Sequence, residues 1–190
     1  MIDQLLNYDT ELFLYLNNLG AETWDGLWLI ITDKISSIPL YALLLFLLYK
    51  KFGGKSLLII AVVVALMITF TDQISNVFKH GFERQRPCGN ASIIDQMRFI
   101  AVRCGKYGFF SGHASNSMAV AVFAGLMLKS FYKYLIFILL FWSFIVAYSR
   151  IYVGVHYPLD IFCGMAFGAF SGGLFYKLST YLQYRILKKN

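Results

Sequence analysis

The most regular feature of the chain is a series of long apolar stretches separated by short polar segments. Four of these stretches reach or approach the roughly 20 residues that a helix needs to cross a bilayer. They are residues 56–78, 113–128, 134–148 and 158–178. A fifth, 27–49, is long enough if it tolerates Asp33 and Lys34 inside it. The pattern predicts an all-α protein, a polytopic transmembrane helical bundle with about five spans.

The first 20 residues show a different pattern. Apolar side chains recur there at roughly helical spacing among acidic and amide residues: Ile2, Leu5, Leu6, Leu12, Phe13, Leu16 and Leu19. This spacing favours an amphipathic helix over residues 1–20 that lies in the membrane interface. The alternative interpretation is a frayed polar terminus.

Composition supports the membrane interpretation. Hydrophobic residues make up 58% of the 190 residues and charged residues only 14%, and the mean hydropathy is +0.61. These values exclude a disordered chain and an ordinary soluble domain. The net charge of +7 is better explained by membrane topology than by nucleic acid, which we do not expect as a partner. The length predicts a single domain, 1–190.

The basic residues divide into two groups if the apolar stretches cross the membrane in turn. One side then carries nine of the Lys and Arg residues and no acid: Lys50, Lys51, Lys55, Lys129, Lys133, Lys177, Arg185, Lys188 and Lys189. By the positive-inside rule this side is cytoplasmic, with the C-terminus inside and the loop 79–112 outside. We therefore expect a protein of a bacterial-type inner membrane, with that loop facing the periplasm or the outside.

Reactive side chains concentrate in three segments on the predicted outer face. They are Lys79-x6-Arg86-Pro87, Ser111-Gly112-His113 and Ser149-Arg150-x5-His156-x3-Asp160. Each segment alone has an ordinary explanation. Lys and Arg at a membrane boundary are usually snorkelling anchors, Ser-Gly-His often caps a helix, and a His-Asp pair can be a structural hydrogen bond.

Together the segments describe a phosphate site. Lys79, Arg86 and Arg150 would be costly to gather at the membrane edge without an anion to neutralise them. Ser111 and Gly112 lead into a predicted helix, whose free N-terminal N–H groups and dipole suit phosphate. The three segments therefore predict binding of a phosphate group.

The two histidines of these segments predict chemistry on that phosphate. Pro158 suits the first turn of a helix, so Asp160 can accept a hydrogen bond from one imidazole nitrogen of His156 and leave the other free as a nucleophile. His113 is then available as the acid for a leaving oxygen. We expect no metal and no cofactor, because the sequence has no carboxylate cluster and the cations and backbone donors would stabilise the phosphoryl charge.

These three motifs, in this order and each at a helix boundary, resemble those of the type 2 phosphatidic acid phosphatase family of membrane lipid phosphatases. The resemblance covers roughly half of the chain, from Asn76 to about Gly164, and includes the extra Arg84. It implies that His156 forms a phosphohistidine, that Asp160 orients it and that His113 protonates the leaving group. It also implies a phosphate-binding set: Lys79, Arg86, Ser111, Gly112 and Arg150. The family usually has Pro where this chain has Phe110, which puts the rigidity of that loop in doubt.

The function expected from these motifs is hydrolysis of a phosphate monoester or pyrophosphate on an outer-leaflet lipid. Undecaprenyl pyrophosphate and lipid A phosphate are preferred, with phosphatidylglycerol phosphate and phosphatidic acid as further candidates. A vanadium haloperoxidase is disfavoured by the length and composition of the chain. The alternative from another class is a non-catalytic transporter or binder of phosphorylated lipids, which would need the cations but neither histidine.

The outer loop contains further candidates. Cys88 and Cys104 would form a disulfide if the compartment is oxidising, and closing a loop of about 15 residues contributes on the order of 3 kcal/mol. Three arginines are candidates for contacts with a large anionic head group: Arg84, Arg98 and Arg103. Solvated loop charge is the alternative for the last two. Asp72, inside a span, is expected to pair with Lys34 or Lys79 in a structural role.

Overall fold

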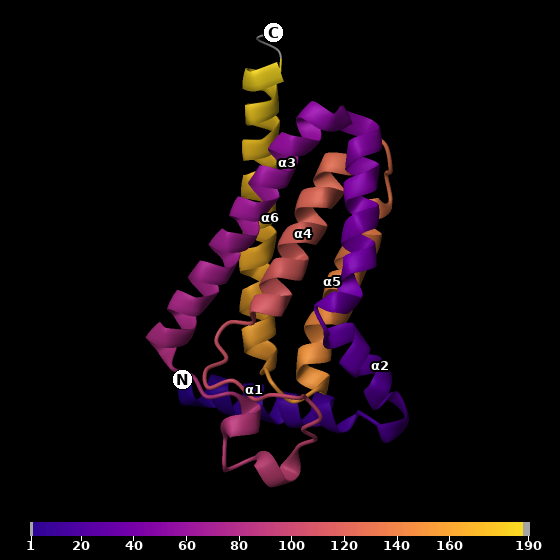
Figure 1. Cartoon of the computed structure of the whole chain (residues 1–190). Helices are drawn as coiled ribbons and strands as arrows, with labels where there is room; N and C mark the ends of the chain where they lie inside the picture. Colours follow the sequence, from indigo (N-terminus) through magenta and orange to yellow (C-terminus); the bar gives the residue numbers. More distant parts are fainter. Residues whose placement is uncertain (1, 188–190) are drawn as a thin grey trace.

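The computed structural model describes residues 2–187, so the predicted cytoplasmic residues Lys188 and Lys189 lie outside the described residues. Over that range the chain forms helices and no strand, which confirms the all-α prediction (Figure 1). The α-helices are α1 (Ile2–Asn18), α2 (Glu22–Thr32), α3 (Ile38–Phe82), α4 (Gly112–Leu128), α5 (Leu135–Tyr152) and α6 (Pro158–Leu187). Short 3-10 turns occupy η1 (Ile35–Ser37), η2 (Pro87–Gly89) and η3 (Ile94–Gln96).

α3 consists of two arms that meet at Gly53. The φ of Gly53 is 74°, in the left-handed region where glycine carries no steric penalty. Figure 1 shows α3 running up one side of the bundle, turning at the end opposite α1 and returning along the other side. We call residues 38–52 the first arm and residues 54–82 the second arm. Their separation leaves room between them for α4 and for the cavity described below.

The predicted span 27–49 is wrong as a single helix. α2 ends at Thr32, and α3 begins only at Ile38. At the break, the Asp33 carboxylate accepts a hydrogen bond from the backbone N–H of Ile35 (3.3 Å), a local bond that competes with helical pairing. Pro39 then stands in the first turn of α3, where its missing N–H costs nothing.

The other predicted spans correspond to the second arm, α4, α5 and α6. α4 ends at Leu128 as predicted, whereas the other three helices end later than expected. Lys79 lies within the second arm, and Ser149 and Arg150 lie within α5 rather than in a loop. The segments Ile35–Phe82, Leu135–Tyr152 and Pro158–Leu187 are each long and apolar enough to cross a membrane, and α4 is a shorter apolar helix of 17 residues. The chain is therefore a membrane protein, while the number of crossings stays a prediction.

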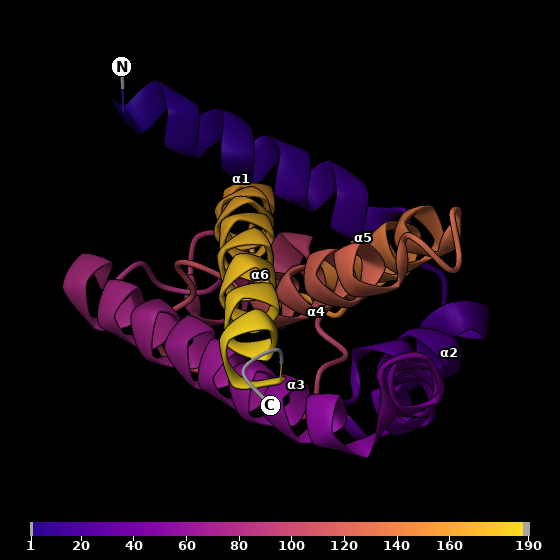
Figure 2. The ribbon, with the colours of Figure 1, turned by 90° about the horizontal axis from the view of Figure 1, so that it is seen from above.

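α4 lies at the centre of the bundle and packs closely against α6 (Figure 2). Gly164, Gly168 and Gly172 form a stripe on α6 that faces the α4 backbone. A Cβ at Gly164 or Gly172 would lie 2.6 Å from the carbonyl oxygen of Ser111 or Ala119. Small residues thus allow the close approach on which helix association in lipid depends.

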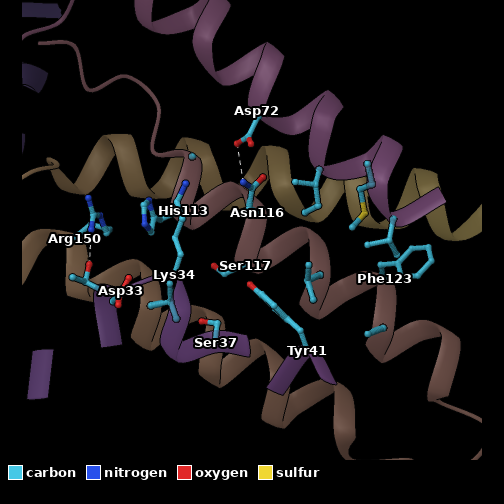
Figure 3. Close-up of a pocket in the computed structure, with 18 of the residues that line it drawn as sticks. Asp33, Lys34, Ser37, Tyr41, Asp72, His113, Asn116, Ser117, Phe123 and Arg150 are labelled. Carbon is cyan, nitrogen blue, oxygen red and sulfur yellow. Dashed lines mark hydrogen bonds between the residues drawn. The ribbon is translucent and has the colours of Figure 1, made fainter. Parts of the chain in front are cut away.

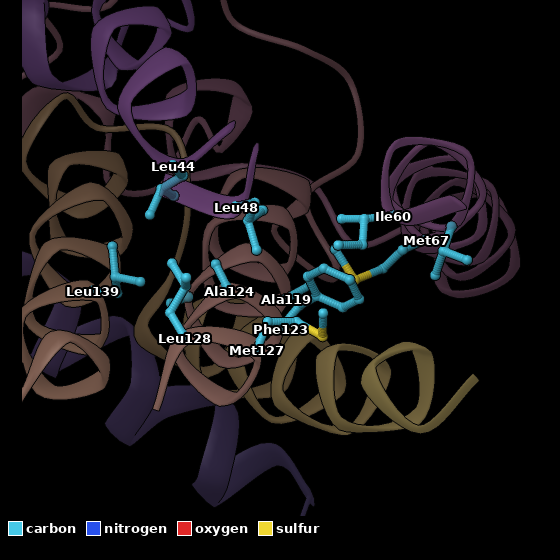
Figure 4. Packing of buried hydrophobic residues seen from close by; sticks show 12 residues of the cluster. Leu44, Leu48, Ile60, Met67, Ala119, Phe123, Ala124, Met127, Leu128 and Leu139 are labelled. Atoms are coloured by element: carbon cyan, nitrogen blue, oxygen red, sulfur yellow. The ribbon is translucent and has the colours of Figure 1, made fainter. Parts of the chain in front are cut away.

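A buried apolar cluster packs between the helices of the bundle (Figure 4). Both arms of α3 contribute to it, together with α4 and α5. Its larger members are Leu44, Leu48, Ile60, Met67, Phe123, Met127, Leu128 and Leu139. The cluster fixes the spacing of the helices whose opposite ends carry the reactive side chains.

α1 lies across the ends of α5 and α6 rather than along the bundle (Figures 1 and 2). The side chains of Asp9, Phe13 and Asn17 face the protein and are buried. The exposed side carries large apolar residues: Ile2, Leu5, Tyr8, Leu12 and Tyr15. An exposed apolar face on a helix that crosses the bundle end supports the predicted interfacial position.

Candidate active site

A cavity of about 650 Å³ opens between the arms of α3 and reaches α4 and the last turn of α5. One end is polar, and both histidines of the sequence motifs line it; His113 is labelled in Figure 3. The other end is apolar and is lined by residues that include Leu44, Val64 and Phe123. The cavity thus joins a charged end to a slot suited to hydrocarbon.

His156 and Asp160 form a buried pair at the polar end. His156 lies in the turn between α5 and α6, and its Nδ1 is 3.2 Å from Oδ2 of Asp160 in the first turn of α6. The same carboxylate oxygen accepts the backbone N–H of Tyr157 (3.1 Å). Burial, followed by the charges of Arg86 and Arg150, lowers the pKa of His156 well below its ordinary 6.5. The imidazole is therefore neutral at physiological pH and can act as a nucleophile.

His113 enters the cavity from the first turn of α4. This turn begins at Gly112, and Ser111 is its N-cap, with Oγ accepting the backbone N–H of Ala114 (3.4 Å). Gly112 and His113 line the cavity, whereas Ser111 is buried behind it. The hydroxyl of Ser111 thus serves helix α4 in this structure, and its predicted contact with phosphate stays a prediction.

The three predicted cations come together at the polar end from three different elements. Lys79 on the second arm, Arg86 in the following loop and Arg150 on α5 all line the cavity. Arg86 is held by its Nε–H, which donates to the carbonyl of Tyr107 (3.0 Å). Arg150 Nη1 donates to the hydroxyl of Thr32, while its buried Nε has no hydrogen-bond partner among the described residues. A buried donor without a partner is costly, and this one belongs to a side chain that lines the cavity.

Lys34 is a fourth cation at this end, and the sequence motifs did not include it. It lies at the break between α2 and α3 and lines the cavity beside His113 and Arg150 (Figure 3). We refer to Lys34, Lys79, Arg86 and Arg150 as the cationic cluster. The signal that could have identified Lys34 was its position inside an apolar stretch, where a charge usually has a functional reason.

Gly108 is a second position that the motifs missed. A Cβ there would lie 2.9 Å from Oδ2 of Asp160 and 3.6 Å from Nδ1 of His156. Only glycine lets this backbone approach the pair so closely. Nothing in the local sequence distinguishes Gly108 from any other loop glycine, so only the structure reveals it.

Two of the three arginines predicted to contact a head group form ion pairs within the protein. Arg84 forms ion pairs with Asp9 and Asp160, and Arg98 forms one with Asp25 on α2 (2.8 Å). Neither lines the cavity, because both guanidinium groups are engaged in holding elements together. Arg103 is exposed outside the cavity, and its contact with a head group stays a prediction.

The remaining sequence candidates have structural partners. Cys88 and Cys104 are joined by a disulfide, with Cα atoms 5.9 Å apart. Asp72 accepts a hydrogen bond from the Asn116 amide (2.8 Å) rather than pairing with a lysine. Phe110, which replaces the usual proline, is 3% exposed, and its ring lies 5.2 Å from those of Phe78 and Phe167. Packing therefore holds this loop where proline would have restricted φ.

Residues 56–184, more than half of the chain, match the family model of the PAP2 superfamily. The chain belongs to the PAP2 superfamily. Two curated relatives are named lipid A 4'-phosphatase, one from Bacteroides thetaiotaomicron and one from Porphyromonas gingivalis. Both are 35% identical over 98% of this chain, which covers 83% and 79% of their lengths. A third relative, an undecaprenyl-diphosphatase from Sulfolobus acidocaldarius, is 28% identical over 88% of this chain and 76% of its own.

Two solved structures share the PAP2 fold. LpxE from Aquifex aeolicus superposes with a TM-score of 0.69 at 25% identity, over 88% of this chain and 94% of that one. A transmembrane PAP2 type phosphatidylglycerolphosphate phosphatase from Bacillus subtilis gives a TM-score of 0.72 at 19% identity, over 96% of this chain and 88% of that one. Family membership and these relatives make the chain a membrane lipid phosphatase. The alternative of a non-catalytic lipid transporter or binder gains no support.

Proposed function

We propose that this PAP2 member hydrolyses a phosphate monoester of a lipid A-type phosphorylated lipid through a phosphohistidine on His156. The observation that carries the proposal is a single cavity with two parts. Its polar end holds His156, His113 and the cationic cluster, and its apolar end is a slot between the arms of α3. A phosphorylated lipid has the same division between a dianionic group and hydrocarbon.

In the first proposed step, Nε2 of His156 attacks phosphorus while the ester P–O bond breaks. Asp160 accepts the Nδ1–H and stabilises the positive charge that develops on the imidazole. Once the phosphate dianion is bound and offsets the neighbouring cations, His113 carries a proton, which it gives to the leaving oxygen, so the lipid departs as a neutral alcohol. Lys79, Arg86, Arg150 and the N-terminal N–H groups of α4 stabilise the equatorial oxygens.

In the second proposed step, water displaces the phosphoryl group from His156. His113, now neutral, takes a proton from that water, the P–N bond breaks, and inorganic phosphate is released. Both histidines then return to their starting states. All of these transfers use side chains of this chain, and we propose that the reaction needs no metal, so turnover should persist in EDTA.

The names of the relatives support the substrate class. Two of them are lipid A 4'-phosphatases that match along almost the whole chain. The undecaprenyl-diphosphatase relative makes undecaprenyl diphosphate the second candidate, since the apolar slot would suit a polyprenyl chain as well as acyl chains.

We also propose that the site faces the periplasm or the outside of an inner membrane, with the C-terminus in the cytoplasm. The α3 turn that carries Lys50, Lys51 and Lys55 lies at the same end of the bundle as the C-terminal end of α6, opposite α1 (Figure 1). The disulfide between Cys88 and Cys104 lies in the loop after the second arm. An oxidising compartment at that loop supports the same orientation.

The test is phosphate release by purified protein in detergent from four lipids: lipid A, undecaprenyl diphosphate, phosphatidylglycerol phosphate and phosphatidic acid. We expect the wild-type protein to prefer lipid A, and His156→Ala to release no phosphate from any of the four. Turnover by His156→Ala would refute the assigned nucleophile. A preference for undecaprenyl diphosphate would support the second candidate instead.

A further inference from the structure

Asp9 is an acid on α1 that packs into the protein instead of facing water or lipid. Its side chain is 5% exposed. One carboxylate oxygen accepts the backbone N–H of Leu159 (2.8 Å), at the N-terminus of α6. The other pairs with Nη2 of Arg84 (2.6 Å). Asp9 thus connects the helix that crosses the bundle end to the turn that carries His156.

Arg84 is held on three sides. Its Nη1 lies 2.9 Å from Oδ1 of Asp160, and its Cζ lies 4.2 Å from the centroid of the Tyr157 ring. The Tyr157 ring in turn packs edge-on against Phe13 of α1 (5.4 Å between centroids). A guanidinium between two carboxylates and an aromatic face has a single well-defined orientation.

A continuous row of titratable groups results: Asp9, Arg84, Asp160 and His156. We call these four residues the paired row. Asp9 does not line the cavity, so a substrate there would not touch it. Any effect of Asp9 on the reaction must pass through Arg84 or through α6.

We propose that Asp9 is a positioning residue for the phosphatase reaction, which acts through Arg84 to hold the Asp160 carboxylate against His156. The proposal rests on the function proposed above. With Asp9 present, Arg84 is shared between two carboxylates, and Asp160 keeps Oδ2 on the imidazole. With Asp9 neutralised, Arg84 has only Asp160, which it draws away from Nδ1. The two remaining charges then cancel, so the row no longer carries the net negative charge that favours the positive imidazole of the phosphohistidine.

The experiment compares Asp9→Asn with Glu11→Gln, a matched change at an exposed acid of the same helix. Asn keeps an oxygen for the Leu159 N–H and removes the charge that pairs with Arg84. The readout is the single-turnover rate constant of phosphate release, which does not depend on the fraction of active protein and so separates positioning from loss of folded enzyme. For Asp9→Asn we expect this constant to fall about tenfold to a hundredfold, with KM within about twofold because the cavity is unchanged. Glu11→Gln should match the wild type.

A double-mutant cycle tests whether Asp9 acts through Arg84. In an Arg84→Gln background, Asp9→Asn should change the rate constant by less than about twofold. The proposal is overturned if Asp9→Asn alone keeps the wild-type rate constant, or if it costs the same factor in both backgrounds. Wild-type turnover that His156→Ala abolishes, together with an unaffected Asp9→Asn, would refute this inference and leave the proposed function standing.

Discussion

The paired row and the cationic cluster lie at the same end of the bundle and differ in how their charges are compensated. In the paired row every charge has a partner within 3.2 Å, and the row alternates between acid and base. In the cationic cluster, four positive side chains line one cavity, and none forms an ion pair with a carboxylate of the described residues. Asp33 and Asp72 also line the cavity, but their carboxylates accept hydrogen bonds from an amide N–H.

The difference separates positioning from binding. A buried charge with a partner fixes the position of both side chains. Like charges without partners raise the free energy of the empty site and favour the binding of an anion. His156 lies between the two sets, with Asp160 on one nitrogen and the cavity beside the ring. We therefore expect changes in the cationic cluster to act on phosphate itself and changes near the paired row to act on the rate of chemistry.

Among the changes that test this comparison, the largest effect is expected for Arg150→Gln, which removes a cluster charge whose Nε–H has no partner among the described residues. Loss of one preorganised donor to a phosphoryl transition state costs about 10²–10³-fold in kcat. We expect a fall of that size in kcat/KM for lipid phosphate, together with weaker inhibition by inorganic phosphate. Arg185→Gln, near the other end of α6, is the control and should keep the wild-type value. Equal losses in both variants would contradict a specific role for Arg150.

Gly108→Ala is expected to have the next largest effect and acts on the paired row. The new Cβ would lie 2.9 Å from Oδ2 of Asp160, so the carboxylate or the loop must shift. A displacement of this kind costs about tenfold to a hundredfold in kcat, with little change in KM, as steady-state kinetics would show. Gly89→Ala provides the control, because a Cβ at Gly89 meets nothing within 4 Å. An unchanged kcat in Gly108→Ala would mean that the loop relaxes without moving Asp160.

The sequence predicted most of what depends on residue type and spacing. The apolar stretches gave four helices with approximately correct bounds, and the three motifs predicted that Lys79, Arg86, Arg150 and both histidines would meet. Hydrophobic length and the His-x3-Asp spacing are local properties, so a single sequence records them.

What the sequence could not provide were contacts between distant segments. Asp9 and Arg84 are 75 residues apart, and Asp25 and Arg98 are 73 apart. Without these partners, Arg84 and Arg98 could equally well be solvated or bound to a head group. The sequence does not reveal the role of Gly108 for the same reason. That role depends on the side chain of Asp160, which is distant in sequence and would contact a Cβ at position 108. Asp33 and Lys34 stand out inside an apolar stretch, but nothing in the sequence marks them as one wall of the cavity.

Lys34 gives a smaller test of the cationic cluster. Lys34 lines the cavity but is exposed to solvent. Solvent and salt therefore screen its charge more than they screen the charges of Arg86 and Arg150. We expect Lys34→Gln to reduce kcat/KM by about twofold to fivefold, and the difference from wild type to shrink at high ionic strength. Lys55→Gln, at the α3 turn, is the matched control. A salt-independent loss would indicate a direct contact with the substrate instead.

The smallest expected change is in the titration of His156. Burial first, and then the charges of Arg86 and Arg150, lower its pKa well below 6.5. For a base with a lowered pKa, the neutral form persists as the pH falls through 6.5, and protonation begins only below that value. The 13C resonance of the His156 ring, assigned by its loss in His156→Ala, should shift little between pH 7.5 and 6, while free histidine in the same buffer titrates. In Arg150→Gln the protonation of His156 should move to higher pH, because one opposing charge is gone. A His156 that titrates like free histidine in the wild-type protein would show that the cationic cluster does not act on the nucleophile.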